Sequence, residues 1–300
     1  MEEEIDLYFF RCYDEDKYDQ RRVKMKKILA SLMMVGLIFC LGGCNVPWMQ
    51  QKTEKTKAAK VIQADKVEGT MKGMKLKVGV SNDMAPFSYY DSEQKKITGF
   101  DIDLLDKLSE YLGFEYELYP MNMKKLEQKI KNKELDLAIA GISITDERQR
   151  EFSFTDTYYE TYLQIVVRKD SQITDRKEIT EKKVGVVEGT SSAQYAEDYL
   201  SEDNKITYYK NITKVWNDLE KGTIDATIYD TTGIQNYMQE HADDTNLSVL
   251  NEQLNSEESN YGIMFVKGYK YLDQFNVALQ VLNNDGTYQK LKEQWIKTKE

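Results

Sequence analysis

Residues 136–148 read DLAIAGISITDER and place an apolar run directly before a glycine, two hydroxyl side chains and an arginine. The run Leu137–Ala140 predicts a buried strand, because strands covered on both faces are continuously apolar. Thr145 has the residue type and position of a helix N-cap, and acidic residues follow it. In open α/β sheets, ligands bind beyond the carboxyl ends of strands, so this stretch predicts both a fold and a binding site.

The alternation of strands and helices extends in both directions from this stretch. Strands are predicted at 76–80, 114–118, 135–140, 162–167, 184–187, 206–209, 226–229, 247–250 and 262–266, and helices at 102–112, around 126–130, and at 193–200, 213–220, 231–239, 270–283 and 287–297. Asp101 is a candidate cap for the first helix and Gly113 its stop. The pattern predicts an α/β protein with parallel sheets covered by helices, in two lobes separated by the strand at 162–167.

Composition excludes several classes of function. The 300 residues carry 41 Lys and Arg against 51 Asp and Glu, a net charge of -10 that argues against binding to nucleic acid. His241 is the single histidine, so a multi-histidine metal site is excluded. Cys12, Cys40 and Cys44 all precede the predicted strands, so the body has neither an internal disulfide nor a cysteine-ligated metal. We expect no metal and no cofactor.

The N-terminus indicates export and anchoring. Residues 25–44, MKKILASLMMVGLIFCLGGC, have the basic start and apolar run of a secretory signal, and the run is too short to span a bilayer. Residues 41–44, LGGC, resemble a bacterial lipobox, which implies a signal at 25–43 and lipidation of Cys44. The alternative is an ordinary cleaved signal with an incidental cysteine. Lipidation would anchor the protein on the extracytoplasmic face of the cell membrane.

The regions on either side of this signal have different compositions. Residues 1–24 are acidic where a signal has a positive leading region, so we expect translation to start at Met25 and this extension to be misassigned. Residues 44–73 begin with the lipidated cysteine, and the rest has little apolar periodicity. We interpret it as a solvated, flexible tether.

Two charged side chains follow predicted strands. Arg148 lies one helical turn beyond Thr145, where its planar guanidinium matches a carboxylate in a bidentate manner. The alternative is a surface salt bridge with Glu147 or Asp156. Asp230 ends an apolar strand, where its carboxylate would pair with an ammonium group, unless it is simply an N-cap for the next helix.

Two loops complete the candidate site. Residues 189–192, GTSS, form a strand-to-helix turn whose free amides suit an anion, although the same residues also serve as plain helix caps. Residues 81–87, SNDMAPF, follow the first strand and bring Met84 and Phe87 toward the same rim. Core packing explains Phe87 equally well.

These stretches together resemble the amino-acid-binding solute-binding proteins (family 3) of ABC transporters, and the resemblance covers residues 76–296. The matching stretches, in the order of the family, are APFSY at 85–89, GFDID at 99–103, ISITDER at 142–148, FSFTDTYY at 152–159, VGVVEGT at 184–190, DA at 225–226 and DGTY at 285–288. The resemblance implies a two-lobed periplasmic-binding-protein fold of type II, the Venus-flytrap fold, with parallel or mixed sheets and two crossover strands. It implies a first lobe of residues 74–165 plus 259–300 and a second lobe of 166–258.

The resemblance also implies a role for each residue of the site. Arg148 would bind the α-carboxylate of an amino acid, helped by amides at Ser143 and Ser191, and Thr190 lies in the matching turn. Asp230 would pair with the α-ammonium, with Gly141 and Ser143 as further acceptors. Physical chemistry agrees, because a zwitterion that leaves water needs both charges paired. Closure around the amino acid would be detected by a membrane permease with its ATPase, and we expect the protein itself to be a monomer.

Three positions depart from the pattern of the family. Met84 and Met123 stand where relatives commonly have aromatic residues, and Ser81 stands where an acid is often found. Methionine is flexible and adapts to varied shapes, although both methionines also suit ordinary core filling. Loss of the acid weakens the case for a basic ligand. We expect an amino acid that is polar and uncharged or contains sulfur.

An enzyme and a ligand sensor are the two alternative classes of function. Some proteins of this fold resemble cyclohexadienyl dehydratases, whose chemistry needs a general acid in the cleft. The candidates here are Asp83, Glu188 and Asp230, and the last already has a simpler role. The third class is a ligand sensor, which the sequence disfavours because no signalling domain is visible. We therefore expect a binding protein that is not an enzyme.

Overall fold

A computed structural model of the chain describes residues 66–296. Five strands of this described part form a first sheet in the order β5-β1-β6-β13-β7. They are β1 (Lys75–Val80), β5 (Glu115–Pro120), β6 (Leu137–Ala138), β7 (Phe152–Phe154) and β13 (Met264–Val266). β1 pairs in parallel with β5 and β6, whereas β13 pairs antiparallel with β6 and β7. The sheet is therefore mixed, and it inserts a strand from near the C-terminus between two earlier ones.

A second sheet is built from the middle of the chain, in the order β10-β9-β11-β8-β12. Its strands are β8 (Leu163–Arg168), β9 (Lys183–Val187), β10 (Lys205–Tyr209), β11 (Ala226–Asp230) and β12 (Leu247–Val249). β9 pairs in parallel with β10 and β11, while β8 pairs antiparallel with β11 and β12. Since β8 begins at Leu163, this sheet starts slightly before the boundary at 166 that we expected.

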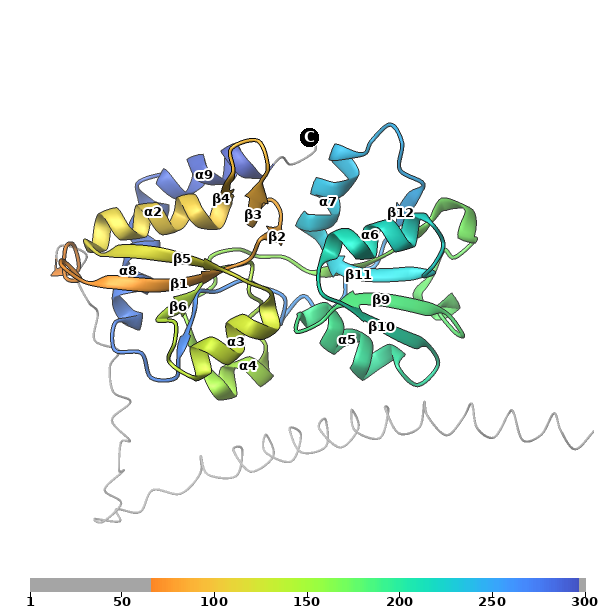
Figure 1. The fold of residues 1–300 in the computed structure, drawn as a ribbon, viewed down its shortest axis with the longest axis horizontal. Helices are drawn as coiled ribbons and strands as arrows, with labels where there is room; N and C mark the ends of the chain where they lie inside the picture. The colour runs from red at the N-terminus through yellow and green to blue at the C-terminus, as the bar shows by residue number, and fades with distance from the viewer. Residues whose placement is uncertain (1–65, 297–300) are drawn as a thin grey trace, which may run out of the picture. The chain divides into compact units, whose positions relative to one another are not determined.

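Helices cover both faces of each sheet (Figure 1). On the first sheet, α2 (Phe100–Leu112), α8 (Leu272–Asn284) and α9 (Thr287–Trp295) pack together, and α3 (Met123–Lys131) and α4 (Asp146–Glu151) lie on the other side. On the second, α5 (Ser191–Leu200) lies opposite α6 (Ile212–Glu220) and α7 (Thr231–Glu240). We call each sheet with its helices a lobe. The α/β architecture expected from the sequence is confirmed, with mixed rather than purely parallel sheets.

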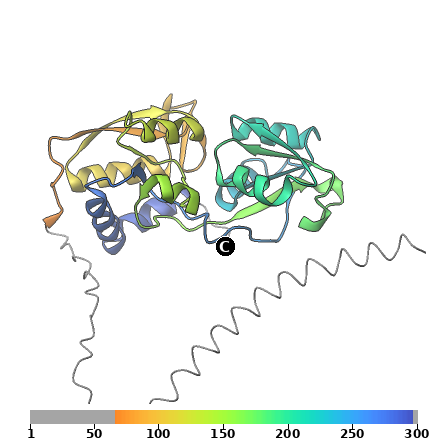
Figure 2. The same ribbon diagram turned by 90° about the horizontal axis from the view of Figure 1, so that it is seen from below.

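Two chain segments connect the lobes and run side by side, as Figure 2 shows. One joins β7 to β8 and the other joins β12 to β13. They pair through isolated antiparallel bridges, Tyr159 with Tyr261 and Leu163 with Leu254. These segments place the loops at the strand ends of one lobe opposite those of the other.

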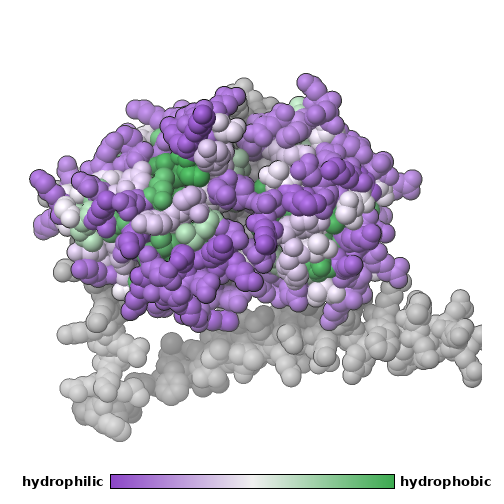
Figure 3. All heavy atoms as spheres, viewed as in Figure 1, coloured by the Kyte–Doolittle hydropathy of each residue, from purple (hydrophilic) through white to green (hydrophobic). Residues whose placement is uncertain are grey.

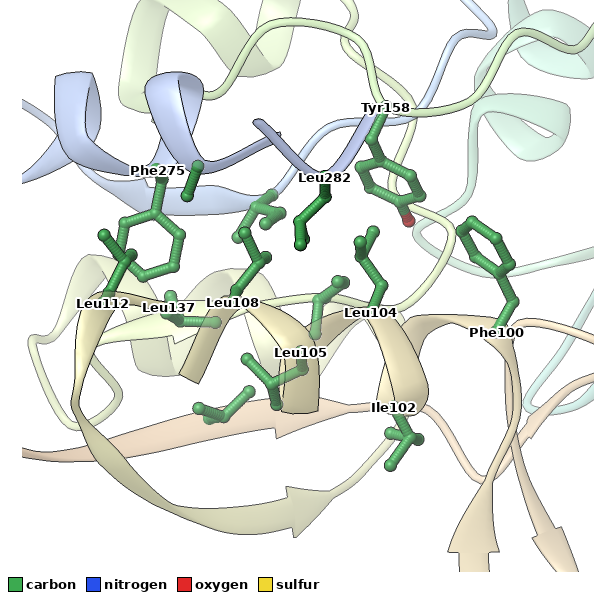
Figure 4. Close-up of a cluster of buried hydrophobic side chains, with 14 of the residues drawn as sticks. Phe100, Ile102, Leu104, Leu105, Leu108, Leu112, Leu137, Tyr158, Phe275 and Leu282 are labelled. Carbon is green, nitrogen blue, oxygen red and sulfur yellow. The ribbon is translucent and has the colours of Figure 1, made fainter. Parts of the chain in front are cut away.

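The core of the first lobe is organised by α2 (Figure 4). Leu104 and Leu108 recur at helical spacing, are fully buried and point toward the side of α8 that carries Phe275 and Leu282. Each such side chain contributes about 1.5–3 kcal/mol by leaving water. Packing of this apolar stripe, more than helix propensity, therefore holds α2 in place.

The sequence predicted the C-terminal end of α2 correctly and its N-terminal cap wrongly. Gly113 stops the helix in a left-handed conformation with φ 84°, as predicted. The predicted cap was wrong, because the N-cap is Gly99 and Asp101 lies inside the first turn. A Cβ at Gly99 would lie 2.2 Å from the carbonyl oxygen of Phe87, so the backbone approach requires glycine there. Asp101 instead reaches across the fold, as described below.

A small three-stranded sheet was not predicted. It consists of β2 (Asp83–Met84), β3 (Ser88–Asp91) and β4 (Lys96–Thr98), in the order β2-β3-β4. These strands are too short to show the alternation on which sequence prediction depends. The sheet orients the loop that follows β1, and with it Met84.

The start of the described chain packs against the first lobe. Val67 and Met71 are buried, and the amides of Gly69 and Met71 donate to the carbonyls of Tyr111 and Leu112. Residues 66–73 are therefore not part of a solvated tether, contrary to the sequence interpretation. Two apolar residues in a polar stretch gave too weak a pattern for this packing to be recognised.

The expectations for residues 1–24, the signal at 25–43, Cys44 and the tether up to residue 65 lie outside the described residues. Within 66–296, no helix is long and apolar enough to cross a membrane. The face of the protein seen in Figure 3 is mostly hydrophilic, with apolar side chains gathered on one part of the first lobe.

Candidate functional site

Two serine hydroxyls from different lobes meet at the centre of the candidate site. Ser143 lies in the loop after β6, and Ser191 is the first residue of α5. Their Oγ atoms are 2.9 Å apart, and both residues are buried. The structure thus brings together two of the polar residues that the sequence singled out.

Arg148 is held between the lobes at the start of α4. Its backbone amide donates to the side chain of Thr145, which is the predicted N-cap. Its guanidinium donates from Nη1 to the carbonyl of Ser143 at 2.9 Å and from Nη2 to the carbonyl of Gly189, in the second lobe, at 2.7 Å. Arg148 is only 8% exposed, so this cation is fixed in a largely buried position.

The carboxylate partner of Arg148 was missed in the sequence. Nε donates to Oε1 of Glu127, on α3, at 2.8 Å. The salt bridges considered from the sequence involved Glu147 and Asp156, and neither forms an ion pair with Arg148 within the described residues. No local signal identifies Glu127, because the contact joins two helices and depends on their packing.

Asp230 has one satisfied and one unsatisfied oxygen. It ends β11 and caps α7, with Oδ1 accepting from the amide of Gly233 at 2.8 Å. Oδ2 is buried and has no hydrogen-bond partner within the described residues. Burial raises the pKa of Asp230 to about 6, and the Gly233 amide and then the nearby Tyr261 hydroxyl offset part of that rise. Both sequence interpretations of Asp230 are therefore compatible, since one oxygen caps the helix while the other is available to a cation.

Tyr261 lies next to Asp230 and was also missed. Burial and then the charge of Asp230 raise the pKa of this tyrosine well above its usual value, which indicates that the two groups are close. The Tyr261 hydroxyl is buried without a hydrogen-bond partner in the described part of the chain. The hydroxyl also lowers the pKa of Asp230, so each group is a polar neighbour of the other. Neither Oδ2 of Asp230 nor this hydroxyl forms a hydrogen bond of good geometry in the described residues, so this corner of the site can still accept a ligand that pairs with them.

Gly141 and Met84 lie against each other on the first-lobe side. Gly141 has φ 57°, and a Cβ there would lie 2.8 Å from Cε of Met84 and 3.3 Å from the ring of Tyr261. On the opposite side, the hydroxyl of Tyr229 donates to the sulfur of Met84 at 2.9 Å. Met84 therefore lies between the two lobes, where a flexible side chain adapts to what it contacts.

The side chain of Asp101 holds the backbone amide of Gly141. Its Oδ2 accepts from the Gly141 amide at 2.8 Å, and its Oδ1 accepts from the hydroxyl of Tyr158 at 2.9 Å. Burial raises the pKa of Asp101 to about 7, although both hydrogen bonds favour the ionised form. This carboxyl fixes the backbone amide of Gly141, a residue that the resemblance assigns to the ligand.

Ser81 and Asp83 form a second contact region between the lobes. The Ser81 hydroxyl donates to Oδ1 of Asp83 at 3.0 Å, and Oδ2 of Asp83 accepts from the amide of Ile212, at the start of α6, at 3.2 Å. Burial raises the pKa of Asp83. Both oxygens of Asp83 thus have partners within the chain.

The three remaining candidates from the sequence are Phe87, Thr190 and Met123. Phe87 is fully buried and packs edge-to-face on Tyr159 and Tyr261, with ring centroids 4.9 and 5.0 Å apart, so it lies in the core rather than on the rim. Thr190 caps α5, with its hydroxyl donating to the carbonyl of Val187. Met123 is partly buried against the cluster of apolar residues under α3.

A crevice of about 780 Å³ opens beside the arginine. Its lining includes Glu127 and Arg148 from the first lobe and Gly189, Thr190 and Ser191 from the second. Asp230 is not among its lining residues. The first lobe thus supplies a buried cation, Arg148, and the second lobe supplies a buried carboxylate, Asp230. Together these two charges complement those of a zwitterion.

The family model of bacterial extracellular solute-binding proteins, family 3, matches residues 76–298. The chain belongs to this family. The resemblance inferred from the sequence is thereby confirmed, and this family 3 solute-binding protein acts outside the cytoplasm, as the extracellular class to which it belongs does.

Relatives of the family 3 solute-binding protein include proteins for different amino acids. It is 31% identical over 223 residues to the arginine-binding extracellular protein ArtP of Bacillus subtilis (strain 168), covering 74% of this chain and 86% of ArtP. It is 30% identical over 224 residues to the L-cystine-binding protein TcyJ of Escherichia coli (strain K12), covering 74% of this chain and 82% of TcyJ. Both relatives are named as proteins that bind an amino acid.

A solved structure confirms the fold class. An ancestral arginine-binding protein bound to arginine superposes with a TM-score of 0.69 and 31% identity, covering 74% of this chain and 98% of that one. The family 3 solute-binding protein therefore has the type II periplasmic-binding-protein fold expected from the sequence.

Proposed function

We propose that this protein captures an amino acid between its two lobes outside the cytoplasm and delivers it to an ABC permease, without catalysing a reaction. The observation that carries this proposal is a pair of buried, opposite charges, one on each lobe: the guanidinium of Arg148 and the carboxylate of Asp230, whose Oδ2 has no hydrogen bond in the described residues. Arg148 would take the α-carboxylate and Asp230 the α-ammonium. An unpaired buried polar group costs about 1–3 kcal/mol, and a bound zwitterion relieves that cost.

Closure would follow from contacts that the ligand makes with both lobes. Arg148 belongs to the first lobe and Asp230 to the second, so an amino acid that pairs with both is bound only when the lobes approach. A ligand shifts a conformational equilibrium by its difference in affinity for the two states. The permease would then distinguish the closed, loaded form. We propose two lobes with the limits expected from the sequence, except that β8 lies wholly in the second lobe and residues 66–73 belong to the first. The two connecting segments join them, and we propose that the protein is a monomer.

We further propose that the ligand is polar and uncharged or contains sulfur. Met84, between Gly141 and the Tyr229 hydroxyl, offers a soft and adaptable surface. Ser81 replaces an acid, and the neighbouring Asp83 has both oxygens bonded within the chain. The names of the relatives include arginine- and L-cystine-binding proteins, so both ligands belong in the test.

The proposed function is tested by equilibrium binding. The full chain, in mild detergent and refolded from denaturant to remove carried ligand, is titrated calorimetrically with the twenty amino acids, cystine and the ring acid prephenate. We expect binding of one or two amino acids, with an accompanying rise in Tm because the ligand binds the native state. Binding of arginine or lysine alone would overturn the preference for an uncharged ligand. Turnover of prephenate, or binding of no amino acid, would overturn the proposed function.

A further inference from the structure

The ion pair between Glu127 and Arg148 has an unusually buried cation. The arginine side chain is 9% exposed, whereas the glutamate side chain is 30% exposed. The other ion pairs among residues 66–296 have cations at least 18% exposed, and most are far more exposed. The chain therefore supplies a carboxylate of its own to the same guanidinium that the proposed function assigns to a carboxylate of the ligand.

The hydrogen bonds of Arg148 leave limited capacity for a ligand. A guanidinium has five N–H groups, and three are used by Glu127 and by the carbonyls of Ser143 and Gly189. The two carbonyls are neutral, but Glu127 cancels the charge of the arginine. A second carboxylate at this cation would meet a site that is already electrically neutral and would be repelled by Glu127.

We propose that Glu127 is an internal competitor for the carboxylate-binding arginine and thereby sets the affinity for the amino acid. This inference rests on the proposed function. In the absence of ligand, the Glu127 carboxylate satisfies the buried cation. When an amino acid binds, its α-carboxylate takes over the charge of Arg148, and part of the binding free energy is spent on displacing Glu127.

The surroundings of Glu127 suit displacement. Glu127 lies on α3 at the lining of the 780 Å³ crevice, so its side chain has space to turn away from the arginine. Lys124 and Lys131, from the same helix, also line the crevice, and both are exposed and paired with other glutamates, Glu188 and Glu151. A carboxylate released from Arg148 therefore remains hydrated and close to positive charge, whereas a released buried arginine would not.

Glu127→Gln tests this proposal, because glutamine keeps the shape of the side chain and removes its charge. We expect the full-length variant to bind the same amino acid at least about tenfold more tightly by calorimetry, which corresponds to about 1.4 kcal/mol. The matched control is Glu147→Gln, which removes the same charge from an exposed position that lines the same crevice beside Arg148. The control should change affinity less than twofold.

Thermal unfolding gives a second measurement that a purely structural role would not reproduce. Ligand-free Glu127→Gln should have a lower Tm than the natural protein, because the buried cation loses its partner. At saturating ligand the two Tm values should converge, so the rise caused by ligand is larger in the variant. A structural role would lower both values equally.

The outcomes separate this inference from the proposed function. Unchanged or weaker binding by Glu127→Gln, with intact binding by the natural protein, would show that Glu127 only positions Arg148 and overturns the inference alone. An equal gain in Glu147→Gln would reduce the effect to general charge and likewise overturns it. Failure of both the natural protein and Glu127→Gln to bind any amino acid overturns the proposed function and the inference with it. Binding seen only in Glu127→Gln supports both.

Discussion

At the scale of single residues, Arg148 and Asp230 differ in how much of their hydrogen-bonding capacity is used. Arg148 has partners from α3, from its own loop and from the second lobe. Asp230 has one partner and one buried oxygen without any in the described residues. The ligand-free arginine is therefore satisfied by the protein, and the ligand-free aspartate is satisfied only in part.

Arg148→Ala should lower amino-acid affinity at least about 100-fold, which is about 2.7 kcal/mol. The physical reason is that the α-carboxylate would enter a largely buried site without a cation. Calorimetric titration measures the loss, and circular dichroism checks the fold. Arg150→Ala, an exposed residue of the same helix, is the control and should bind normally. Near-normal affinity of Arg148→Ala would contradict the assignment of this residue to the carboxylate.

The pKa of Asp230 predicts how affinity depends on pH. Burial raises this pKa to about 6, so the carboxyl is ionised at pH 7 and takes up a proton below pH 6. Because an ammonium pairs with the ionised form, affinity should fall by about tenfold per pH unit below about pH 6. Asp230→Asn should bind weakly at pH 7 and lack this dependence. A flat profile in the natural protein would exclude Asp230 as the partner of the ammonium.

Protonation of Asp230 has the opposite effect on the stability of the ligand-free protein. The folded pKa of Asp230 lies above the ordinary value of 3.8, so its neutral form is favoured in the folded state. Its stabilising contribution is complete below about pH 4 and is lost as the pH rises through about 6. Ligand binding at pH 7 therefore restores stability that the empty site lacks.

At the scale of elements, sequence pattern predicted the helices and strands that have long apolar periodicity. The stop of α2 at Gly113 and the caps of α4 and α5 at Thr145 and Thr190 follow from local chemistry. The short strands of the small sheet and β7 have too few residues to show a period. Asp101 was misread as a cap because its partners, Gly141 and Tyr158, are distant in the sequence.

Some residues of the candidate site could likewise be predicted from the sequence, and others could not. Ser143, Ser191 and Asp230 could be found because they follow predicted strands, where α/β proteins bind ligands. Glu127 and Tyr261 could not be found, because each becomes part of the site only through packing between elements. Phe87 illustrates a different limit, since an aromatic residue in a loop has the same pattern whether it lines a rim or fills a core, and the sequence leaves both interpretations open.

Asp101 joins α2 to the loop that carries Gly141, and its replacement tests that connection. Asp101→Asn should lower the free energy of unfolding by about 2–3 kcal/mol, because an amide N–H₂ would face a buried donor that now has an acceptor. Urea denaturation measures the change, and Glu110→Gln on the exposed side of the same helix is the control. A change below about 0.5 kcal/mol would show that this carboxyl does not hold the two elements together.

At the scale of the whole molecule, we propose that a lipid on Cys44 anchors the protein to the membrane. Cys44→Ala should release the protein from the membrane fraction into the medium, because the proposed lipid chains would be lost. Fractionation followed by immunoblotting measures the distribution, and Cys40→Ala, in the apolar run before the proposed cleavage point, should stay in the membrane fraction. Retention of Cys44→Ala in the membrane would contradict the lipobox interpretation.

The place of β13 has a consequence for the order of folding. This strand lies between β6 and β7, although more than a hundred residues separate it from them in the sequence. The first sheet therefore remains split until residues 264–266 leave the ribosome or the export channel. The second sheet draws all its strands from one continuous stretch, 163–249, and has no such delay. The lobe that the chain begins is accordingly the lobe that it completes last.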